Sequence, residues 1–433
     1  MKIPTYAETI DFLYNLRLFG TKLGLENTIE LARLAGAPER CLRFIHVAGT
    51  NGKGSTCAMI ESIYREQGYR TGLFTSPHLV SFTERIQVNR VCIPEQEVAR
   101  LAYTLRRKLG ADPGDWPIRP TFFEFVTVIA LLYFLEQRSE IVIWETGLGG
   151  RLDATNIVTP LASVITNIQY DHERWLGSTL EQIAVEKAGI IKPGVPVITG
   201  AREPAALDVI RRTAREAQSP LIEVRDAGEL PVSPRLRGDH QRMNAAVAVA
   251  TVQAVRQTGP VSGASIIHGL ENVDWPGRLQ LLRLGEREIL LDGAHNPDGA
   301  RTLAAALQQD FRDRECTLIL GLLADKSWES MCEILVPLAA RVLLVPVHSE
   351  RSVDVSQLKA FCTARWPEKP VTASAHVAEA IQHSATDPFV VAAGSLLLIG
   401  EAMESLGITS SRSERALNEW DAANAASLPG VSN

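Results

Sequence analysis

The stretch AGTNGKGST, residues 48–56, follows a short apolar run and precedes a helical pattern. Its glycines and its lysine are typical of a loop that binds phosphate, because backbone N–H groups at a helix N-terminus can surround an anion. The common form of such a loop is GxxxxGK[ST]. Here the first two glycines stand only three residues apart, and Gly54 separates Lys53 from Ser55. The order of strand, glycine-rich loop and helix still predicts a phosphate site, and the alternative is a glycine-rich turn with a solvated lysine.

The composition is that of an ordinary globular protein. A chain of 433 residues is longer than one hydrophobic core usually serves, so we expect about two or three domains. The net charge of −6 and the pI near 5.9 predict no contact with nucleic acid or an anionic membrane. No apolar run has membrane-spanning length and no signal sequence is recognisable, so we expect a cytoplasmic protein. Six cysteines without a CxxC pair predict neither a zinc site nor a disulfide framework.

Apolar strand patterns alternate with helical patterns through the first two thirds of the chain. Strands are expected at residues 43–48, 70–74, 140–145, 161–167 and 195–199. After two helices within the first 40 residues, further helices are expected at 55–69, 121–137, 178–189 and 240–255. Such alternation predicts a parallel sheet covered by helices on both faces.

A second α/β series follows the stretch WPGRLQLLRLGERE. Its strands are expected at residues 288–293, 316–322, 341–347 and 388–394, with helices near 298–309, 328–339, 354–364, 375–384 and 395–406. We place the boundary at the charged turn around Gly285, which gives a larger domain over residues 1–284 and a smaller one over 285–433. The last two dozen residues lose the apolar periodicity and are expected to form a frayed tail.

Polar side chains follow two of the expected strands at their carboxyl ends, where open α/β sheets bind ligands. Glu145 ends the strand IVIWE and precedes the glycine-rich segment TGLGGRLDATN, a position suited to a magnesium-binding carboxylate. Asp171 and His172 follow the strand LASVITN, and a neutral histidine there could be a second metal ligand. Taken alone, a glutamate at a strand end can lack any role, and a loop histidine is more often merely solvated. The glycine-rich segment after Glu145 favours a functional role there.

Other polar residues have weaker support from their position alone. Lys187 lies on an expected helix, where an exposed charge is the plain alternative, and Ser76 lies in a loop after the strand RTGLF. In the second domain, LLDGAHNPDG places Asp292, His295 and Asn296 beyond a strand and at a helix N-terminus. These groups could contact a nucleotide across the domain cleft, although Asp292 could equally cap the helix.

Eight segments occur in a fixed order along the chain, namely GTNGKGS, TSPHL, ETGLGGRLDATN, DHERWLG, EKAGIIKPG, HQRMNA, WPGRLQ and DGAHNPDGA. Together they resemble the folylpolyglutamate synthase and dihydrofolate synthase family of the Mur ligase superfamily, over about residues 5–405. The compressed GTNGKGS loop is the form that this family uses for ATP. The resemblance implies an α/β fold in which a P-loop NTPase-like parallel-sheet domain precedes a smaller Rossmann-like α/β domain.

The resemblance also implies roles for individual residues. The implied ATP-binding residues are Gly49, Thr50, Asn51, Gly52, Lys53, Gly54, Ser55, Thr56, Asn244, Arg278, Asp292 and His295. The implied magnesium ligands, for two ions, are Ser76, Glu145, His172 and Lys187, of which Lys187 would be carbamylated and so carry a negative charge. The implied catalytic residues are Lys53, Glu145, His172 and Lys187. Part of the pterin or folate pocket would be built by Thr121, Phe122 and Phe123.

Some positions depart from the usual family pattern. Thr146 stands where valine is common, GLLADKS replaces the more frequent GALADKD, and Phe122 and Phe123 match no single pterin-pocket pattern. None of these departures affects the phosphate loop, but they leave open which pteridine is bound.

The implied reaction is ATP-dependent amide formation by a monomer. A carboxylate of dihydropteroate or of a reduced folate would attack the γ-phosphate of ATP, and the amine of L-glutamate would then displace phosphate from the acyl phosphate. The enzyme could add the first glutamate, extend the chain, or do both, and its size and motif spacing most resemble the bifunctional bacterial type. Two other classes stay open, a Mur-type ligase acting on a UDP-sugar and a P-loop switch without ligase activity.

Overall fold

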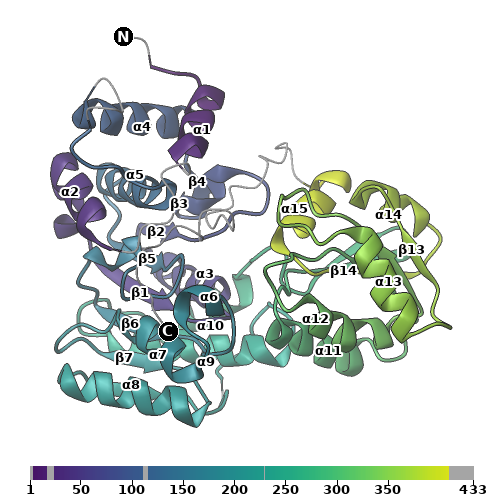
Figure 1. Cartoon of the computed structure of the whole chain (residues 1–433). Coiled ribbons are helices and arrows are strands. Elements are labelled where there is room, and N and C mark those ends of the chain that lie inside the picture. Colours follow the sequence, from purple (N-terminus) through teal and green to yellow (C-terminus); the bar gives the residue numbers. More distant parts are fainter. Residues whose placement is uncertain (1–2, 17–23, 111–115, 229, 409–433) are drawn as a thin grey trace.

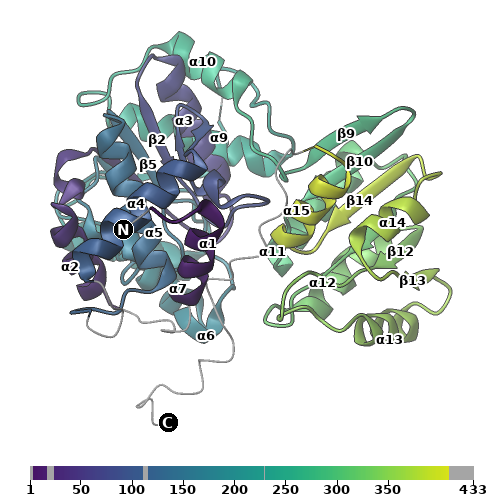
Figure 2. The same cartoon turned by 90° about the horizontal axis from the view of Figure 1, so that it is seen from above.

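The computed structural model describes residues 3–16, 24–110, 116–228 and 230–408, and these residues form two α/β lobes that lie side by side (Figures 1 and 2). The sheet of the first lobe has the strand order β4-β3-β2-β5-β1-β6-β7-β8. Its strands are β1 (Phe44–Ala48), β2 (Thr71–Phe74), β3 (Ile86–Val88), β4 (Val91–Cys92), β5 (Ile141–Glu145), β6 (Ala162–Ile165), β7 (Val197–Thr199) and β8 (Leu221–Glu223). The six strands from β2 to β8 in this order are parallel, and the edge strands β3 and β4 are antiparallel.

Helices cover both faces of this sheet. They are α1 (Tyr6–Asn15), α2 (Glu26–Ala35), α3 (Lys53–Glu66), α4 (Glu95–Leu109), α5 (Phe122–Glu136), α6 (Glu173–Leu176), α7 (Leu180–Ala188), α8 (Pro204–Glu216), α9 (Asp239–Ala254) and α10 (Gly263–Asn272). Side chains alternate across each strand, so Phe44 packs with α5 whereas Ile45 packs with α3 and α9 on the opposite face. Because both faces are buried, β1 reads as a continuous apolar run rather than an alternating one.

The second lobe is smaller and has the strand order β13-β12-β11-β14-β10-β9. Its strands are β9 (Gln280–Leu284), β10 (Arg287–Asp292), β11 (Thr317–Leu320), β12 (Arg341–Leu344), β13 (Val371–Ala373) and β14 (Phe389–Ala393). Its helices are α11 (Pro297–Asp310), α12 (Trp328–Leu335), α13 (Val355–Arg365), α14 (Val377–His383) and α15 (Leu396–Ser405). All neighbouring pairs are parallel except β9 with β10, and α11 and α15 lie on the side that faces the first lobe (Figure 2).

The expected boundary between the domains needs a correction. Strand β9 pairs antiparallel with β10, so the turn around Gly285 lies inside a hairpin of the second sheet rather than between the domains. An exposed hairpin loop has the same polar composition as a linker between domains, so the sequence pattern alone does not distinguish the two. We therefore propose that the second domain begins before Gln280, in the segment after α10.

The expected strands and helices of both series are present, and so is the parallel arrangement of the central strands. The short or edge strands β3, β4, β8, β9 and β13 and the helices α4, α6, α8 and α10 were not expected. The expected frayed tail lies almost wholly outside the described residues. Among the helices of the described chain, none combines the length and the apolar character needed to cross a bilayer.

Candidate active site between the two domains

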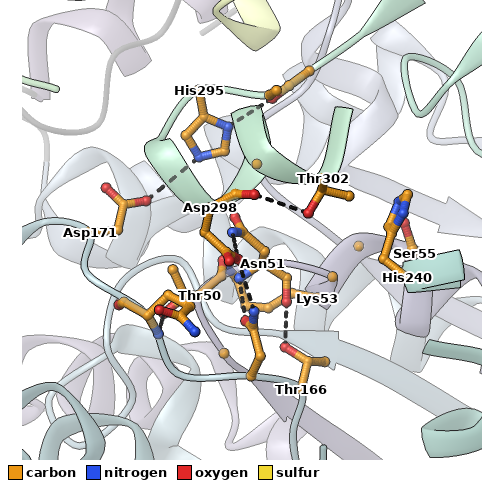
Figure 3. A pocket seen from close by; sticks show the side chains of 18 of the residues that line it. Thr50, Asn51, Lys53, Ser55, Thr166, Asp171, His240, His295, Asp298 and Thr302 are labelled. Carbon is orange, nitrogen blue, oxygen red and sulfur yellow. Dashed lines mark hydrogen bonds and ion pairs between the residues drawn. The ribbon is translucent and has the colours of Figure 1, made fainter. Parts of the chain in front are cut away.

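A cavity of about 530 Å³ lies between the two domains, at the carboxyl ends of the parallel strands of the first sheet (Figure 3). Loops that follow β1, β5 and β6 line it on one side, and residues that follow β10 and β14 line it on the other. The sequence-predicted residues that line it are Gly49, Thr50, Asn51, Gly52, Lys53, Gly54, Ser55, Ser76, Glu145, His172, Lys187, Asn244, Arg278, Asp292 and His295. Residues from both domains, far apart in sequence, therefore meet in one cavity.

The loop after β1 is fastened to the loop after β6. The backbone N–H of Thr50 donates to the carbonyl of Asn167 at 2.9 Å, and the N–H of Asn51 donates to Asn167 Oδ1 at 2.7 Å. Thr166 Oγ1 donates to the carbonyl of Asn51 at 2.7 Å. These bonds fix the loop and leave the first N–H groups of α3, which have no carbonyl partner within the helix, at the cavity. That arrangement suits an anion.

Glycine is required at two positions of this loop. Gly52 has φ of 82°, and a Cβ added there would lie 2.5 Å from Asn244 Oδ1. A Cβ on Gly49 would lie 1.9 Å from Thr166 Oγ1. The compressed spacing therefore places two glycines where side chains of the same domain approach the loop backbone too closely for a Cβ atom.

Lys187 is buried beside the same loop. Its Nζ donates to the carbonyl of Gly49 at 2.7 Å, and the side chain comes from α7. Burial, together with the nearby charge of Lys53, lowers the pKa of the Lys187 amine to about 7. The plain alternative of an exposed helical lysine is therefore wrong, because only 4% of Lys187 is accessible to solvent.

Glu145 ends β5 at the floor of the cavity. One of its carboxylate oxygens accepts a hydrogen bond from the backbone N–H of Ser76 at 3.2 Å, and the residue is buried. The strand ends of β2 and β5 thus bring the hydroxyl of Ser76 and the carboxylate of Glu145 to the same cavity.

Asp171 joins the two domains through ionic contacts. Its Oδ1 lies 2.5 Å from Lys326 Nζ of the second domain, and its Oδ2 lies 3.6 Å from His295 Nε2. Burial opposes ionisation of Asp171, but the facing His172, Lys326 and His295 hold the pKa of its carboxyl well below the usual range. The carboxylate is therefore charged at neutral pH and binds the second domain.

His172 lies against the same lysine. Its φ is 52°, and its Nε2 lies 3.2 Å from Lys326 Nζ. Burial lowers the pKa of the His172 ring to about 3, so the ring is neutral and Nε2 accepts the hydrogen bond from the ammonium group.

The segment between the domains is held by Asp292. Its Oδ2 accepts the N–H of Leu279 at 2.9 Å, and its Oδ1 accepts the N–H of Ala294 at 3.0 Å. The cap of α11 is instead Asn296, whose Oδ1 accepts the N–H of Gly299 at 2.8 Å. Of the two interpretations left open by the sequence, helix capping by Asp292 is therefore wrong. The half-buried Arg278 guanidinium faces Asp292, and its removal from solvent lowers the pKa of that guanidinium.

Two family descriptions match the chain. The Mur ligase middle domain matches residues 47–204, and the domain described as "Mur ligase, glutamate ligase domain" matches residues 277–396. The dihydrofolate synthase/folylpolyglutamate synthase of Bacillus subtilis (strain 168) is 36% identical over 393 residues, which cover 84% of this chain and 91% of the relative. The chain belongs to the folylpolyglutamate synthase and dihydrofolate synthase family. Members of this Mur ligase family are ATP-dependent ligases.

Solved structures of the family have the same two-domain fold. One is E. coli FolC in complex with DHPP and ADP, with a TM-score of 0.83 and 30% identity, covering 94% of this chain and 98% of that one. Another is the bifunctional folylpolyglutamate synthase/dihydrofolate synthase of Yersinia pestis complexed with AMPPNP and a Mn ion, with a TM-score of 0.83 and 29% identity, covering 93% and 98%. The expected family and fold class are confirmed.

Thr121, Phe122 and Phe123, expected to form part of the family's pterin pocket, do not themselves line the cavity. Thr121 is the N-cap of α5, Phe122 packs edge-on against Phe82, and Phe123 packs against Phe74. Both phenylalanines belong to the core between the sheet and α5. Phe123 alone reaches the cavity wall, since a Cβ on the lining residue Gly147 would lie 2.6 Å from its ring.

The donors expected to hold magnesium fit that ion in part. Magnesium prefers oxygen ligands and completes its shell with water and substrate phosphates, and Ser76 and Glu145 supply two oxygens to one cavity. His172 is different, because its Nε2 is occupied by Lys326. No cluster of three or more His, Cys, Asp or Glu side chains is placed to hold a metal in the described part of the chain. The chain's own oxygens therefore suit an ion that substrate phosphates help to bind.

The sequence interpretation missed several residues of the site. Lys326 stands in the segment GLLADKS, which was noted only for its departure from the family pattern, and Gln241 donates to Ser55 Oγ at 3.2 Å. Thr56, expected at the phosphates, is fully buried within α3 and does not line the cavity. The helical period would have excluded Thr56 from the phosphate site. It places Thr56 on the same face of α3 as the buried residues Met59, Ile60 and Ile63.

Proposed function

We propose that this protein is an ATP-dependent ligase that joins L-glutamate to dihydropteroate, to reduced folates, or to both, through an acyl phosphate. The observation that supports this most strongly is the position of the phosphate loop. Its free helix N-terminus and Lys53 open into a cavity whose other wall belongs to the glutamate ligase domain. Family membership and the ligands of the solved relatives support the same reaction.

We propose the following division of roles. The loop backbone, Lys53 and Ser55 bind the ATP phosphates, while Asn244, Arg278, Asp292 and His295 complete the nucleotide site from the hinge and the second domain. Ser76 and Glu145 hold magnesium, with His172 taking part once Lys326 leaves its Nε2. Phe123 contributes to the folate pocket from behind Gly147, and Thr121 and Phe122 support it through α5.

The geometry suggests how these groups would act. Lys53 and the N–H groups of α3 would stabilise charge on the phosphoryl group during transfer. Magnesium, when bound, supplies additional charge neutralisation at the phosphates. Closure of the second domain on the first would bring the amine of glutamate to the activated carbonyl and exclude water, which would otherwise hydrolyse the acyl phosphate.

The direct test is a product assay by mass spectrometry. Purified protein receives ATP, magnesium and L-glutamate with either dihydropteroate or tetrahydrofolate, and products are scanned for added glutamyl units. We expect one added unit on dihydropteroate, further units on tetrahydrofolate, and one ADP released for each unit. ADP release without an amide product would favour the P-loop switch. A parallel reaction receives a UDP-sugar carboxylate as the acceptor, and a product in that reaction alone would favour a Mur-type cell-wall ligase.

Lys187 is proposed to carry a carbamate. A neutral amine is needed to attack CO₂, and the lowered pKa of about 7 keeps a large neutral fraction at physiological pH. In ¹³C-bicarbonate, we expect a protein-bound carbamate resonance that weakens as the pH falls below about 7, because the amine is then protonated. The control is Lys187→Arg, which should lose the resonance. The same resonance in the variant would show that Lys187 is not the modified residue.

The monomeric state and the cytoplasmic location stay predictions. A single species of about 47.4 kDa by light scattering would support the first. Which acceptor is preferred is decided by the product assay described above.

A further inference from the structure

Asn51 directs its side chain away from its own domain, although it lies in the middle of the phosphate loop. Asn51 Nδ2 donates to Asn296 Oδ1 at 3.2 Å and to Asp298 Oδ2 at 2.8 Å. Asn296 Nδ2 donates in return to Asn51 Oδ1 at 3.0 Å. Both donors and the acceptor of this carboxamide therefore face the second domain. Figure 3 shows Asn51 beside Asp298 of that domain.

The backbone of Asn51 is equally occupied, by residues of the first domain. Its N–H donates to Asn167 Oδ1 and its carbonyl accepts from Thr166 Oγ1, both at 2.7 Å. Neither bond involves the side chain. The loop conformation and the direction of the carboxamide are thus fixed by contacts that a substitution of the side chain would leave in place.

The receiving surface is equally rigid. Asn296 is 1% exposed and caps α11, so its Oδ1 also accepts the N–H of Gly299. Its Nδ2 reaches Asp171 Oδ2 at 3.0 Å as well. Asp298 accepts a second hydrogen bond from Asn167 Nδ2 at 3.3 Å. The first turn of α11 is therefore bound to the loops after β1 and β6.

We propose that Asn51 is a positioning residue that couples the phosphate loop to the second domain, and that it is not a ligand of the ATP phosphates. The contact fixes the position of α11 relative to the phosphate loop. It thereby fixes the position of the second-domain residues that line the cavity. This proposal rests on the ligase function proposed above, because alignment across the cleft matters when a group from one domain must reach a phosphate on the other. It replaces the role implied for Asn51 by the family resemblance.

A positioning role for Asn51 predicts different effects on ATP affinity and on kcat. A phosphate ligand that is removed weakens ATP binding and the transition state together, whereas loss of alignment acts mainly on the chemical step. Misplacement of reacting groups by about 1 Å can cost about 100-fold in rate. Removing the Asn51 side chain should therefore lower kcat by about 10- to 100-fold and change the affinity for ATP by less than about twofold.

The test uses the full chain and the variants Asn51→Ala and Asn296→Ser, together with the double variant. Serine retains the cap of α11 but is too short to reach Asn51. The measurements are kcat for amide formation, the Kd of a non-hydrolysable ATP analogue by calorimetry, and the radius of gyration by small-angle X-ray scattering with that analogue bound. We expect both single variants to lose kcat, to bind the analogue normally, and to give a larger radius of gyration than the wild type.

The double variant adds a test of the contact itself. Asn51 and Asn296 share two hydrogen bonds, and each also makes a contact of its own, to Asp298 and to Asp171. The shared bonds are lost only once, so the loss of kcat in the double variant should be smaller than the product of the two single losses. A rise in Kd that accounts for the whole loss would show that Asn51 binds phosphate and would overturn the proposal. Unchanged kcat and unchanged radius of gyration in both single variants would also overturn it. If the wild type forms no amide, the proposed function fails, while the radius of gyration still decides whether Asn51 couples the domains.

Discussion

Replacing Lys53 by alanine should reduce amide formation by about 1,000-fold, since it removes the only full positive charge in the phosphate loop. Lys53 Nζ lies 3.2 Å from the carbonyl of Thr50, inside the loop and at the cavity. The measurement is kcat/KM for ATP, with thermal unfolding as the check that the variant is folded.

The same substitution has a second, indirect effect on Lys187. The charge of Lys53 is one of the causes that lower the pKa of the Lys187 amine, after burial. Its removal should raise that pKa and so reduce the neutral fraction of the amine at pH 7. The ¹³C carbamate resonance of Lys53→Ala should therefore be weaker than that of the wild type and recover at higher pH.

The matched control is Lys53→Arg. Arginine retains the charge but presents a planar fork in place of a compact ammonium group, so it should recover only part of the rate. A fully active Lys53→Ala enzyme would contradict both the phosphate site and the proposed reaction.

The central strands and the phosphate loop followed from the sequence because their cause is local. β1 and β5 are buried on both faces and therefore carry continuous apolar runs. The loop requires glycine at Gly52 because of contacts within the first domain alone. The edge strands β8 and β13 are partly exposed and only three residues long, so their pattern is weak.

The contacts across the cleft could not be predicted in the same way. Lys326 and Asp171 are 155 residues apart in sequence, and neither has a local signal that names its partner. For Asn51 the motif correctly predicted the phosphate loop but not the partners of the Asn51 side chain. A loop of this type suggests phosphate contact, whereas the structure shows the side chain bound to Asn296 and Asp298. The identity of a residue within a motif does not fix the direction in which its side chain points.

A second large effect is expected at Gly400, where the domains touch away from the cavity. A Cβ on Gly400 would lie 1.9 Å from the carbonyl oxygen of Leu79, so α15 approaches the first domain's loop at a distance that only glycine allows. That loop cannot easily retreat, because the N–H groups of Leu79 and Val80 donate to the Glu84 carboxylate at 2.7 and 3.0 Å. It also follows directly on Ser76, which lines the cavity.

Gly400→Ala should therefore lower kcat by about 100-fold, because relief of the clash must move α15 or shift the loop that carries Ser76. Helix propensity alone predicts the opposite, since alanine stabilises a helix interior by about 1 kcal/mol relative to glycine. A loss of activity would thus identify the steric contact as the dominant effect. The measurements are kcat for amide formation and the radius of gyration with the ATP analogue bound.

The matched control is Gly263→Ala at the start of α10, where an added Cβ meets no atom within 4 Å. This substitution should leave kcat within about twofold of the wild type, as expected for a surface change without new contacts. If Gly400→Ala and Gly263→Ala both had the kcat of the wild type, a shift of α15 away from the first domain would have no effect on amide formation. The alignment of the cleft would then depend on contacts at the cavity, such as those of Asn51 and Asp171.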